Sequence, residues 1–190
     1  MLDRKIFYQN IKPSLFAKLT TSQVEGIEAI LNEWDDSGLT DLRWLAYMLA
    51  TTKHETAGTM QPIEEYGKGK GKEYGKPHPV TGKIYYGRGD VQLTWYENYK
   101  KMAKLLGVDL VYHPELALRI DIAVKIMFEG MCTGKSFKGD FTGKHLGNYF
   151  NKTTEDWFNA RRIINSLDRA QLVAGYGVKF HEALKAACSC

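Results

Sequence analysis

The sequence has few cysteines and no long apolar run. Cys132, Cys188 and Cys190 fit neither a disulfide framework nor the ligand spacing of a zinc site. Its purely apolar runs extend over only a few residues, whereas about 20 are needed to span a bilayer. The N-terminus lacks the apolar core and small-residue cleavage site of a secretory signal. We therefore expect a chain made in the cytoplasm without a signal peptide, and no membrane insertion.

The sequence also lacks a strong charge of either sign. It has 26 basic and 22 acidic residues among 190, a formal net charge of +4. This excess is too small to indicate nucleic acid as a partner, although it suits work near an anionic polymer. With 44% hydrophobic residues, a chain of this length can bury a proper core as a single domain. Disordered and collagen-like classes are excluded.

Most of the remaining pattern is helical. Ser22 and Glu25 have the spacing of a capping box, and Asp41 can cap the helix that leads to Glu55. Further helices are expected over about 91–106, 114–131, 154–165 and 168–187, the last interrupted by its glycines. Residues 61–84 lose this periodicity, apart from a short hairpin expected near Pro79–Gly82. Long irregular segments of this kind are usually functional. The fold class expected is mainly α with a few short strands or a small hairpin.

His54 and Glu55 begin a sequence similar to the zinc-binding HExxH motif. The second histidine of that motif is replaced by Gly58, so one metal ligand is missing. No other spacing indicates a metal or nucleotide site. We therefore expect no metal and no cofactor.

Carboxylates offer a different chemistry. Glu55 ends an apolar helix, and Glu64 and Glu65 follow across a turn that contains Pro62. Cleavage of a glycosidic bond with inversion needs one protonated and one ionised carboxyl group, roughly 6.5–9.5 Å apart, with a water between them. A hydroxyl such as that of Thr94 could orient this water. Two glutamates alone also fit a surface salt bridge.

The motifs around these residues resemble glycoside hydrolase family 19 chitinases and the phage endolysins that share their fold. The family pattern is HETGG, a second glutamate nine residues later, then GRGxxQLTW and NY. This chain has HETAG around Glu55, Glu64 at the expected spacing, GRGDVQLTW from Gly87 to Trp95, and Asn98-Tyr99. The segment ARRIIN ending at Asn165 is also similar. The resemblance covers about 40–185.

The resemblance implies a lysozyme-like α+β domain and a role for each matching residue. It implies a single domain over 1–190, with an N-terminal helical segment of about 1–38 and a catalytic core of 40–185. Glu55 matches the general acid, Glu64 the general base and Thr94 the hydroxyl that positions water. The sugar-binding positions it implies are Gln92, Asn98, Asn165 and, less firmly, Arg162 or its neighbour Arg161. Glu65 could take the place of Glu64.

Other roles remain open for some of these residues. Gln92, Thr94 and Asn98 could simply cap a helix start, and Asn165 could end a helix. Trp95 could stack on a sugar or pack behind the site. Trp44 and Trp157 are expected in the core.

The function predicted is hydrolysis of the β-1,4 bond between N-acetylmuramic acid and N-acetylglucosamine in peptidoglycan, by a monomeric phage endolysin. Such an enzyme would reach the cell wall after release through a holin. One alternative is a chitinase that cleaves β-1,4-linked N-acetylglucosamine polymers. A second is an inactive wall-binding module, although both glutamates are present.

Overall fold

A computed structural model describes residues 2–132 and 141–188. The described residues form six α-helices: α1 (Arg4–Leu15), α2 (Thr21–Ser37), α3 (Leu42–Glu55), α4 (Tyr96–Leu106), α5 (Ile120–Met131) and α6 (Ala170–Ala187). Strands β1 (Ile63–Glu64) and β2 (Arg88–Gly89) pair antiparallel, with Glu64 opposite Arg88. Four short 3-10 helices complete the elements: η1 (Glu73–Gly75), η2 (Pro114–Leu118), η3 (Leu146–Asn148) and η4 (Asn159–Ile163). The prediction of a mainly helical fold with a few short strands is confirmed.

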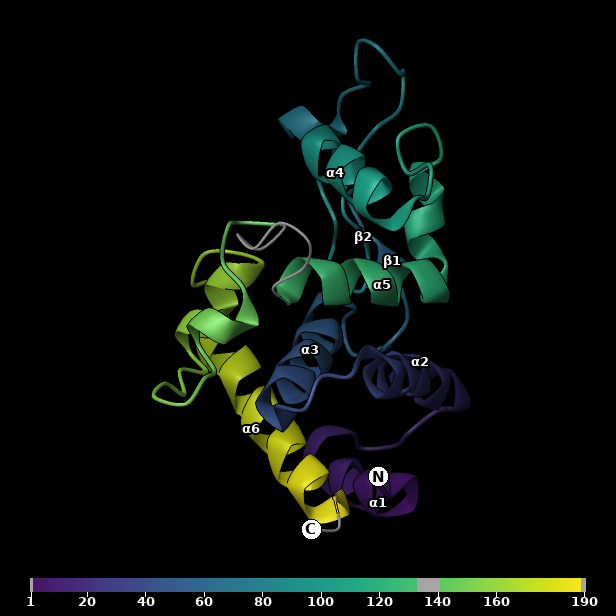
Figure 1. The fold of residues 1–190 in the computed structure, drawn as a ribbon. Coiled ribbons are helices and arrows are strands. Elements are labelled where there is room, and N and C mark those ends of the chain that lie inside the picture. Colours follow the sequence, from purple (N-terminus) through teal and green to yellow (C-terminus); the bar gives the residue numbers. More distant parts are fainter. Residues whose placement is uncertain (1, 133–140, 189–190) are drawn as a thin grey trace.

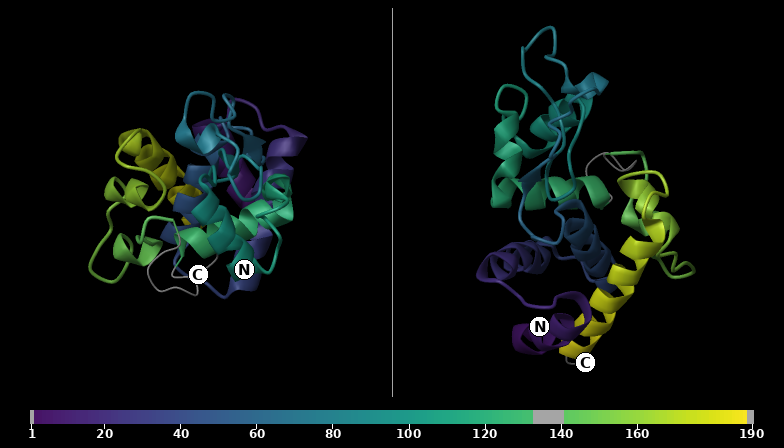
Figure 2. Two further views of the ribbon diagram at one scale, coloured as in Figure 1. Left: turned by 90° about the horizontal axis from the view of Figure 1, so that it is seen from above. Right: turned by 180° about the vertical axis from the view of Figure 1, so that it is seen from behind.

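The helices α3 and α6 lie side by side, with α6 along one edge of the molecule (Figures 1 and 2). Helix α1 packs against the end of α6, so the two chain ends lie close together. The strands and α4 lie beyond one end of α3, with α5 crossing below them in Figure 1. None of the described helices is both long and apolar enough to cross a membrane.

The core is centred on α3 and α5. Every residue of α3 from Leu45 to Thr52 is buried, and so are most residues of α5. A helix buried on nearly all sides needs apolar residues on nearly all sides, which explains the dense apolar sequence of α5. Each fully buried Leu, Ile, Met or Phe contributes about 1.5–3 kcal/mol relative to exposure. Glu55 is the last residue of α3, so a helix buried in the core determines its position.

Three helix starts differ from the predicted positions. The helix expected over about 114–131 begins as α5 only at Ile120, because residues 114–118 form the separate 3-10 helix η2. The capping box of α2 is formed by Thr20 and Gln23 instead of Ser22 and Glu25. The Thr20 hydroxyl accepts a hydrogen bond from the backbone N–H of Gln23, and the side-chain oxygen of Gln23 accepts one from the backbone N–H of Thr20. Helix α4 begins at Tyr96 and not near Val91. Gln92 and Trp95 have positive φ angles, so residues 91–95 form a turn that no helix can include.

The C-terminal part differs more. No α-helix forms over 154–165; only η4 does. The start of this segment is bonded to the preceding turn instead, because Glu155 bridges to Phe150 and the backbone N–H of Asp156 donates to the backbone oxygen of Tyr149. Helix α6 continues through Gly175 and Gly177 without the predicted interruption. A Cβ atom at Gly177 would lie 2.7 Å from the ring of Trp157, so this glycine allows the close approach of that ring. Trp44 and Trp157, predicted in the core, are only half-buried and pack against its outside.

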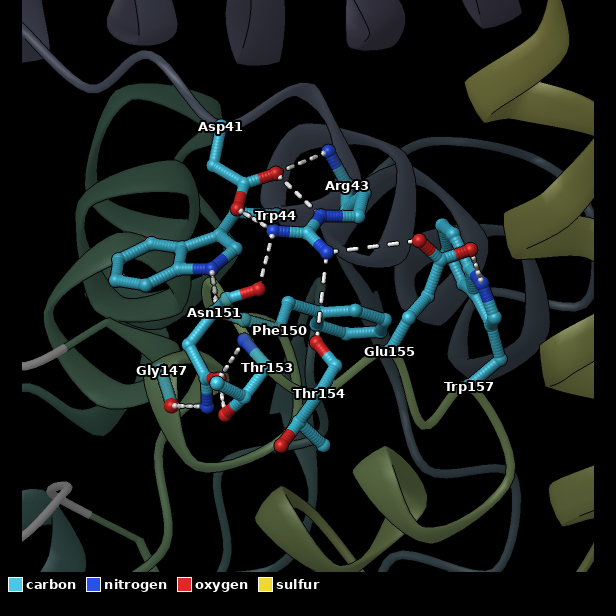
Figure 3. Close-up of polar contacts among 10 residues, drawn as sticks. All are labelled: Asp41, Arg43, Trp44, Gly147, Phe150, Asn151, Thr153, Thr154, Glu155 and Trp157. Carbon is cyan, nitrogen blue, oxygen red and sulfur yellow. Dashed lines mark hydrogen bonds and ion pairs between the residues drawn. The ribbon is translucent and has the colours of Figure 1, made fainter.

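A polar cluster ties the start of α3 to the segment after η3 (Figure 3). The guanidinium of Arg43 makes a fork with the carboxylate of Asp41 and donates to the backbone oxygens of Asn151 and Thr154. The indole of Trp44 donates to the backbone oxygen of Phe150 at 3.1 Å. Burial alone would raise the pKa of Asp41, but the hydrogen bonds from Arg43 lower it. The cluster fixes the segment that leads to η4 against the helix that carries Glu55.

Candidate active site

A cleft of about 500 Å³ lies at the C-terminal end of α3. Its walls come from five parts of the chain. The lining residues are Glu55, Tyr74, Val91, Gln92, Leu93, Thr94, Trp95, Asn98, Phe141, Thr142, Ile164 and Asn165. The residues predicted for the site that line this cleft are Glu55, Gln92, Thr94, Asn98 and Asn165. Glu64, Arg162 and their alternatives Glu65 and Arg161 do not line it.

Glu55 is held by a buried arginine. Nη1 of Arg161 donates to Oε1 of Glu55 at 2.5 Å, and Nε of Arg161 donates to the backbone oxygen of Asp168 at 3.0 Å. The Arg161 side chain is 2% exposed and that of Glu55 is 15% exposed. Among the described residues, the second carboxylate oxygen of Glu55 has no hydrogen-bond partner, which leaves it for a ligand.

The neighbouring arginine takes a different direction. Arg162 is exposed, and its Nε donates to the side chain of Asn159 at 3.3 Å. Its backbone oxygen, with that of Ile163, accepts from the Thr142 hydroxyl at the cleft wall. The sequence favours Arg162 over Arg161 for the site, but Arg161 is the residue that contacts Glu55.

The chain reverses directly after Glu55. Ala57, Gly58 and Met60 have positive φ angles, and Gly58 donates to the backbone oxygen of Lys53, which ends α3 with a left-handed turn. The first turn of α2 holds this reversal, because the Gln23 amide donates to the backbone oxygen of Gly58 at 2.8 Å. The contact is close: a Cβ atom at Gly26 would lie 1.6 Å from the backbone oxygen of Met60. Helix α2 therefore fixes the path from Glu55 toward β1.

Glu64 lies in β1 with three polar neighbours. Nζ of Lys68 is 2.8 Å from Oε2, and the Tyr86 hydroxyl donates to Oε1 at 2.6 Å. Nε of Arg88 is 3.9 Å from the same Oε1. The hydrogen bonds from Lys68 and then Tyr86 lower the pKa of Glu64, so this carboxylate is ionised at neutral pH. The contacts of Lys68 and Tyr86 with Glu64 are not predicted from the sequence. The available signal is the GRG motif, because its strand pairs with the strand that carries Glu64.

Glu65 supports the loop wall. Its carboxylate accepts from the Tyr74 hydroxyl at 3.0 Å and from the backbone N–H of Gly87 at 3.2 Å. A Cβ atom at Gly75 would lie 1.8 Å from the backbone oxygen of Gly69, so the loop closes on itself at two glycines. Glu65 and this closure place Tyr74 at the cleft. The expected hairpin near Pro79–Gly82 is a tight turn closed by His78 and Lys83, without strands.

The turn before α4 forms another wall. The Gln92 amide donates to the backbone oxygens of Ile63 and Gly89, which joins this turn to both strands. Oγ1 of Thr94 donates to the backbone oxygen of Gln92 at 2.7 Å, and Nδ2 of Asn98 donates to that of Thr94 at 2.9 Å. Because the Thr94 hydroxyl donates its proton to Gln92, its oxygen can act only as an acceptor toward water. These side chains both brace the turn and line the cleft.

Two further residues frame the opening. Trp95 is 50% exposed, so it does not pack behind the site. Asn165 follows η4 and lines the cleft, and its Oδ1 accepts from the N–H of Ser166 at 2.8 Å. The cleft is lined by a carboxyl group, by hydroxyl and amide groups and by an exposed aromatic ring, a surface suited to a hydroxyl-rich ligand.

Comparison with known families gives one match of wide extent. The sequence profile of glycoside hydrolase family 19, described as chitinase class I, matches residues 34–132, which are 99 of the 190. The matched stretch contains Glu55, Glu64 and the turn from Gln92 to Asn98.

Individual relatives match over a shorter stretch. An endochitinase of Arabidopsis thaliana is 41% identical over 78 residues, which cover 40% of this chain and 27% of that protein. An inactive chitinase-like protein of Hevea brasiliensis is 34% identical over 88 residues, covering 39% of this chain and 28% of that protein. The alignments thus span little more than a quarter of these relatives.

The fold matches over nearly the whole chain. The crystal structure of a bacterial family 19 chitinase superimposes with a TM-score of 0.62 at 24% identity, covering 96% of this chain and 94% of that one. At this identity the likeness shows the fold alone, and it is the fold of the family 19 enzymes.

Proposed function

The chain belongs to glycoside hydrolase family 19, the chitinase class I family, and we propose that it hydrolyses β-1,4 bonds of a polymer containing N-acetylglucosamine, with inversion at the anomeric carbon. The observation that carries this proposal is the cleft itself. It gathers Glu55, Thr94, Asn98 and Asn165 from distant parts of the sequence around one groove. A buried arginine fixes the carboxyl group of Glu55 within it.

In the proposed reaction Glu55 is the general acid. Its free carboxyl oxygen delivers a proton to the glycosidic oxygen as the bond to the anomeric carbon breaks, so the leaving sugar departs as a neutral alcohol. Arg161 holds the other oxygen and sets the direction of the transfer. It also stabilises the carboxylate that remains after the proton has left.

Glu64 is the proposed general base. Its lowered pKa keeps it ionised, so it can take a proton from water while the water oxygen bonds to the opposite face of the sugar. The Thr94 hydroxyl accepts the water's other hydrogen. Lys68 occupies one oxygen of Glu64, but its side chain is 62% exposed and is free to move aside when substrate and water enter.

For the polymer, the comparisons favour chitin over the peptidoglycan that the sequence alone suggested. The Arabidopsis relative is an endochitinase by name and the matched bacterial structure is a chitinase, while the Hevea relative is named an inactive chitinase-like protein. Peptidoglycan stays a second candidate for one reason: the loop Lys68–Lys76 adds exposed lysines near Glu64, and peptidoglycan carries peptide carboxylates that would be attracted to them. Chitin is uncharged.

A paired assay tests the proposal and separates the two polymers. Purified wild type is given N-acetylglucosamine hexamer and, at equal concentration, outer-membrane-permeabilised Gram-negative cells. We expect the hexamer to be cleaved, with the α-anomer as the first product in the proton NMR spectrum. The rate of cleavage should fall about 10²–10⁴-fold in Glu55→Gln. Faster lysis of cells with an intact hexamer would assign the enzyme to peptidoglycan. Binding without turnover on either polymer would indicate an inactive binding module and overturn the proposal.

A further inference from the structure

Arg88 is a buried cation beside the proposed general base. It is 6% exposed, and among the described residues the only carboxylate within 4 Å of its guanidinium is that of Glu64. The backbones of these two residues pair across β1 and β2, so their side chains project from the same face of the sheet. On its other side the backbone of Arg88 pairs with Leu93, in the turn that carries Thr94. Arg88 thus lies between the base and the turn that supplies the hydroxyl for water.

One end of the Arg88 guanidinium is fixed by three acceptors. Its Nη1 donates to the backbone oxygens of Ile84 and Tyr86, at 3.1 and 3.4 Å, and to the Tyr99 hydroxyl at 3.1 Å. The Tyr99 hydroxyl in turn donates to the backbone oxygen of Tyr86 at 2.8 Å. These contacts hold the guanidinium over the Tyr86 ring, with its central carbon 3.6 Å from the ring centroid. Such cation–π contacts are stronger where they are shielded from water, as here.

The ring under the guanidinium belongs to the residue that holds Glu64. The Tyr86 hydroxyl donates to Oε1 of Glu64 at 2.6 Å. The place of this hydroxyl depends on the plane of its ring, and the guanidinium covers one face of that ring. Arg88 therefore limits the movement of Tyr86 and, through it, that of the Glu64 carboxylate.

The other end of the Arg88 guanidinium has a donor without an acceptor. Its Nε is buried, has no hydrogen-bond partner among the described residues, and lies 3.9 Å from the same Oε1 of Glu64. A buried donor without a partner is costly and uncommon in folded proteins. A shift of about 1 Å would turn this approach into a hydrogen bond.

We propose that Arg88 is the positioning residue of the general base: it holds Oε1 of Glu64 through Tyr86 and through its own Nε–H, and so leaves Oε2 to take the proton of the water. The inference rests on the proposed function for the role of Glu64. Oε2 suits this task because its partner Lys68 has a side chain that is 62% exposed and can withdraw. Tyr86 and Arg88 are buried and stay in place.

The same arrangement keeps Glu64 ionised when water enters. Lys68 and then Tyr86 lower the pKa of Glu64 most, and the charge of Arg88 lowers it further. Two of these three groups remain beside Glu64 after Lys68 has withdrawn.

The test measures kcat, KM and the pH profile on the N-acetylglucosamine hexamer. Arg88→Lys keeps the charge but loses the planar stack, and we expect kcat to fall at least 10-fold with KM changed less than 2-fold. Tyr86→Phe keeps the ring but loses the hydroxyl, and we expect a fall of about 10-fold and an acid limb of kcat/KM that shifts upward. Because Arg88 acts mainly through Tyr86, the double variant should have a kcat less than 3-fold below that of Tyr86→Phe.

The matched controls change similar groups that do not contact Glu64. Tyr85→Phe removes the neighbouring buried hydroxyl, which donates to the backbone oxygen of Val111. Arg4→Lys changes an arginine that also has a buried unpaired nitrogen but pairs with Asp35 of α2. Both controls should keep kcat within 2-fold of wild type and leave the acid limb in place, whatever their thermal stability.

A second variant covers the case in which Arg88→Lys does not fold. Tyr99→Phe removes a hydroxyl that holds Nη1 of Arg88 and leaves the arginine in the core, and its kcat should fall at least 3-fold. A kcat within 2-fold of wild type in the folded Arg88 variant, or in Tyr99→Phe where it takes that place, would overturn the inference. So would losses that multiply in the double variant, because Arg88 would then act independently of Tyr86.

The proposed function fails separately, when wild type cleaves no oligomer. The pKa of Glu64 is then measured directly by carbon NMR of its side-chain carboxyl group, with Glu64→Gln to assign the signal. We expect this pKa to rise in Tyr86→Phe and in Arg88→Lys and to stay unchanged in the two controls. An unchanged pKa of Glu64 in Arg88→Lys would overturn the inference.

Discussion

Arg161 reaches Glu55 across 106 residues of sequence and joins η4 to the end of α3. The arginine comes from η4, just before α6, and the glutamate is the last residue of α3. At the same time, Nε of Arg161 donates to the backbone oxygen of Asp168. Both ends of the guanidinium are therefore fixed, and the position of Glu55 depends on how α3 and α6 pack.

This relationship makes Arg161 a positioning residue. Arg161→Lys keeps the positive charge but loses the planar fork, so one of its two hydrogen bonds is lost. We expect kcat to fall at least 10-fold with little change in KM, because the orientation of Glu55 matters more to proton transfer than to binding. Arg162→Lys, one residue away and exposed, is the control and should keep full activity. Equal effects of the two substitutions would contradict the role given to Arg161.

Lys68 should set the acid side of the pH profile. Its hydrogen bond to Glu64 is the largest cause of the lowered pKa of that carboxylate, followed by the bond from Tyr86. Removing the cation in Lys68→Met raises the Glu64 pKa, so Glu64 becomes protonated at a higher pH and the acid limb of kcat/KM shifts upward. Lys70→Met removes an exposed lysine of the same loop and should leave the limb in place. An unshifted limb in Lys68→Met would mean that another group controls it.

Thr94 should matter less than either glutamate, because it orients water without a net proton transfer. Its hydroxyl already donates to the backbone oxygen of Gln92, so only its acceptor side is available. Thr94→Val loses that acceptor and should reduce turnover about 10–10³-fold, in line with one or two hydrogen bonds of roughly 1.5–3 kcal/mol. Thr94→Ser keeps the hydroxyl and should stay within a few-fold of wild type. Normal turnover in Thr94→Val would leave Thr94 only a structural part of the turn.

Local patterns explain why some of these residues were predictable from sequence. The Asp41 cap and the apolar face after it define α3, and they place Glu55 at its end; both are properties of one short segment. Gly107 likewise ends α4 where expected. The choice between Arg161 and Arg162 is different, because neighbouring residues point in different directions. Which one turns inward depends on the packing of η4 against α6 and η3, and no local pattern records it.

The loop contacts of Glu64 could not be predicted for a related reason. Lys68 pairs with Glu64 from a backbone with a φ angle of 45°, a conformation that is uncommon for residues other than glycine. The lysine-rich pattern suggested solvated charges, and most of these side chains are indeed exposed. One of them nevertheless pairs with the candidate base.

Asp90 should make stability depend on pH. It is buried, and desolvation raises the pKa of its carboxyl group to about 7. An unfolded aspartate has a pKa of about 3.9, so the folded protein holds a proton that the unfolded chain releases between these values. Its contribution to the free energy of unfolding is full below about pH 4 and is lost as pH rises through 7.

Asp90→Asn removes this titration. We expect the melting temperature of the variant, relative to wild type, to be higher at pH 8 than at pH 5. Asp36→Asn, at an exposed position, is the control and should follow wild type at both values. The assignment is wrong if the difference between Asp90→Asn and wild type is the same at pH 5 and pH 8.

The Arg43 cluster should contribute more to stability than an exposed ion pair of the same type. Arg43 makes a two-bond fork with Asp41 and also binds two backbone oxygens of the segment that follows η3 (Figure 3). Hydrogen bonds to charged groups contribute about 1.5–3 kcal/mol each, and truncation leaves the Asp41 carboxylate half-buried without its cation.

We therefore expect Arg43→Ala to lower the free energy of unfolding by about 3 kcal/mol, and the melting temperature by about 6–12 °C for a domain of this size. The control is Arg119→Ala. Arg119 makes a similar fork with Asp121, but both side chains are more than half exposed, so its removal should cost less than 1 kcal/mol. Urea unfolding of the two variants at pH 7 compares them directly. Equal destabilisation would show that the backbone contacts of Arg43, which Arg119 lacks, add nothing to the fork.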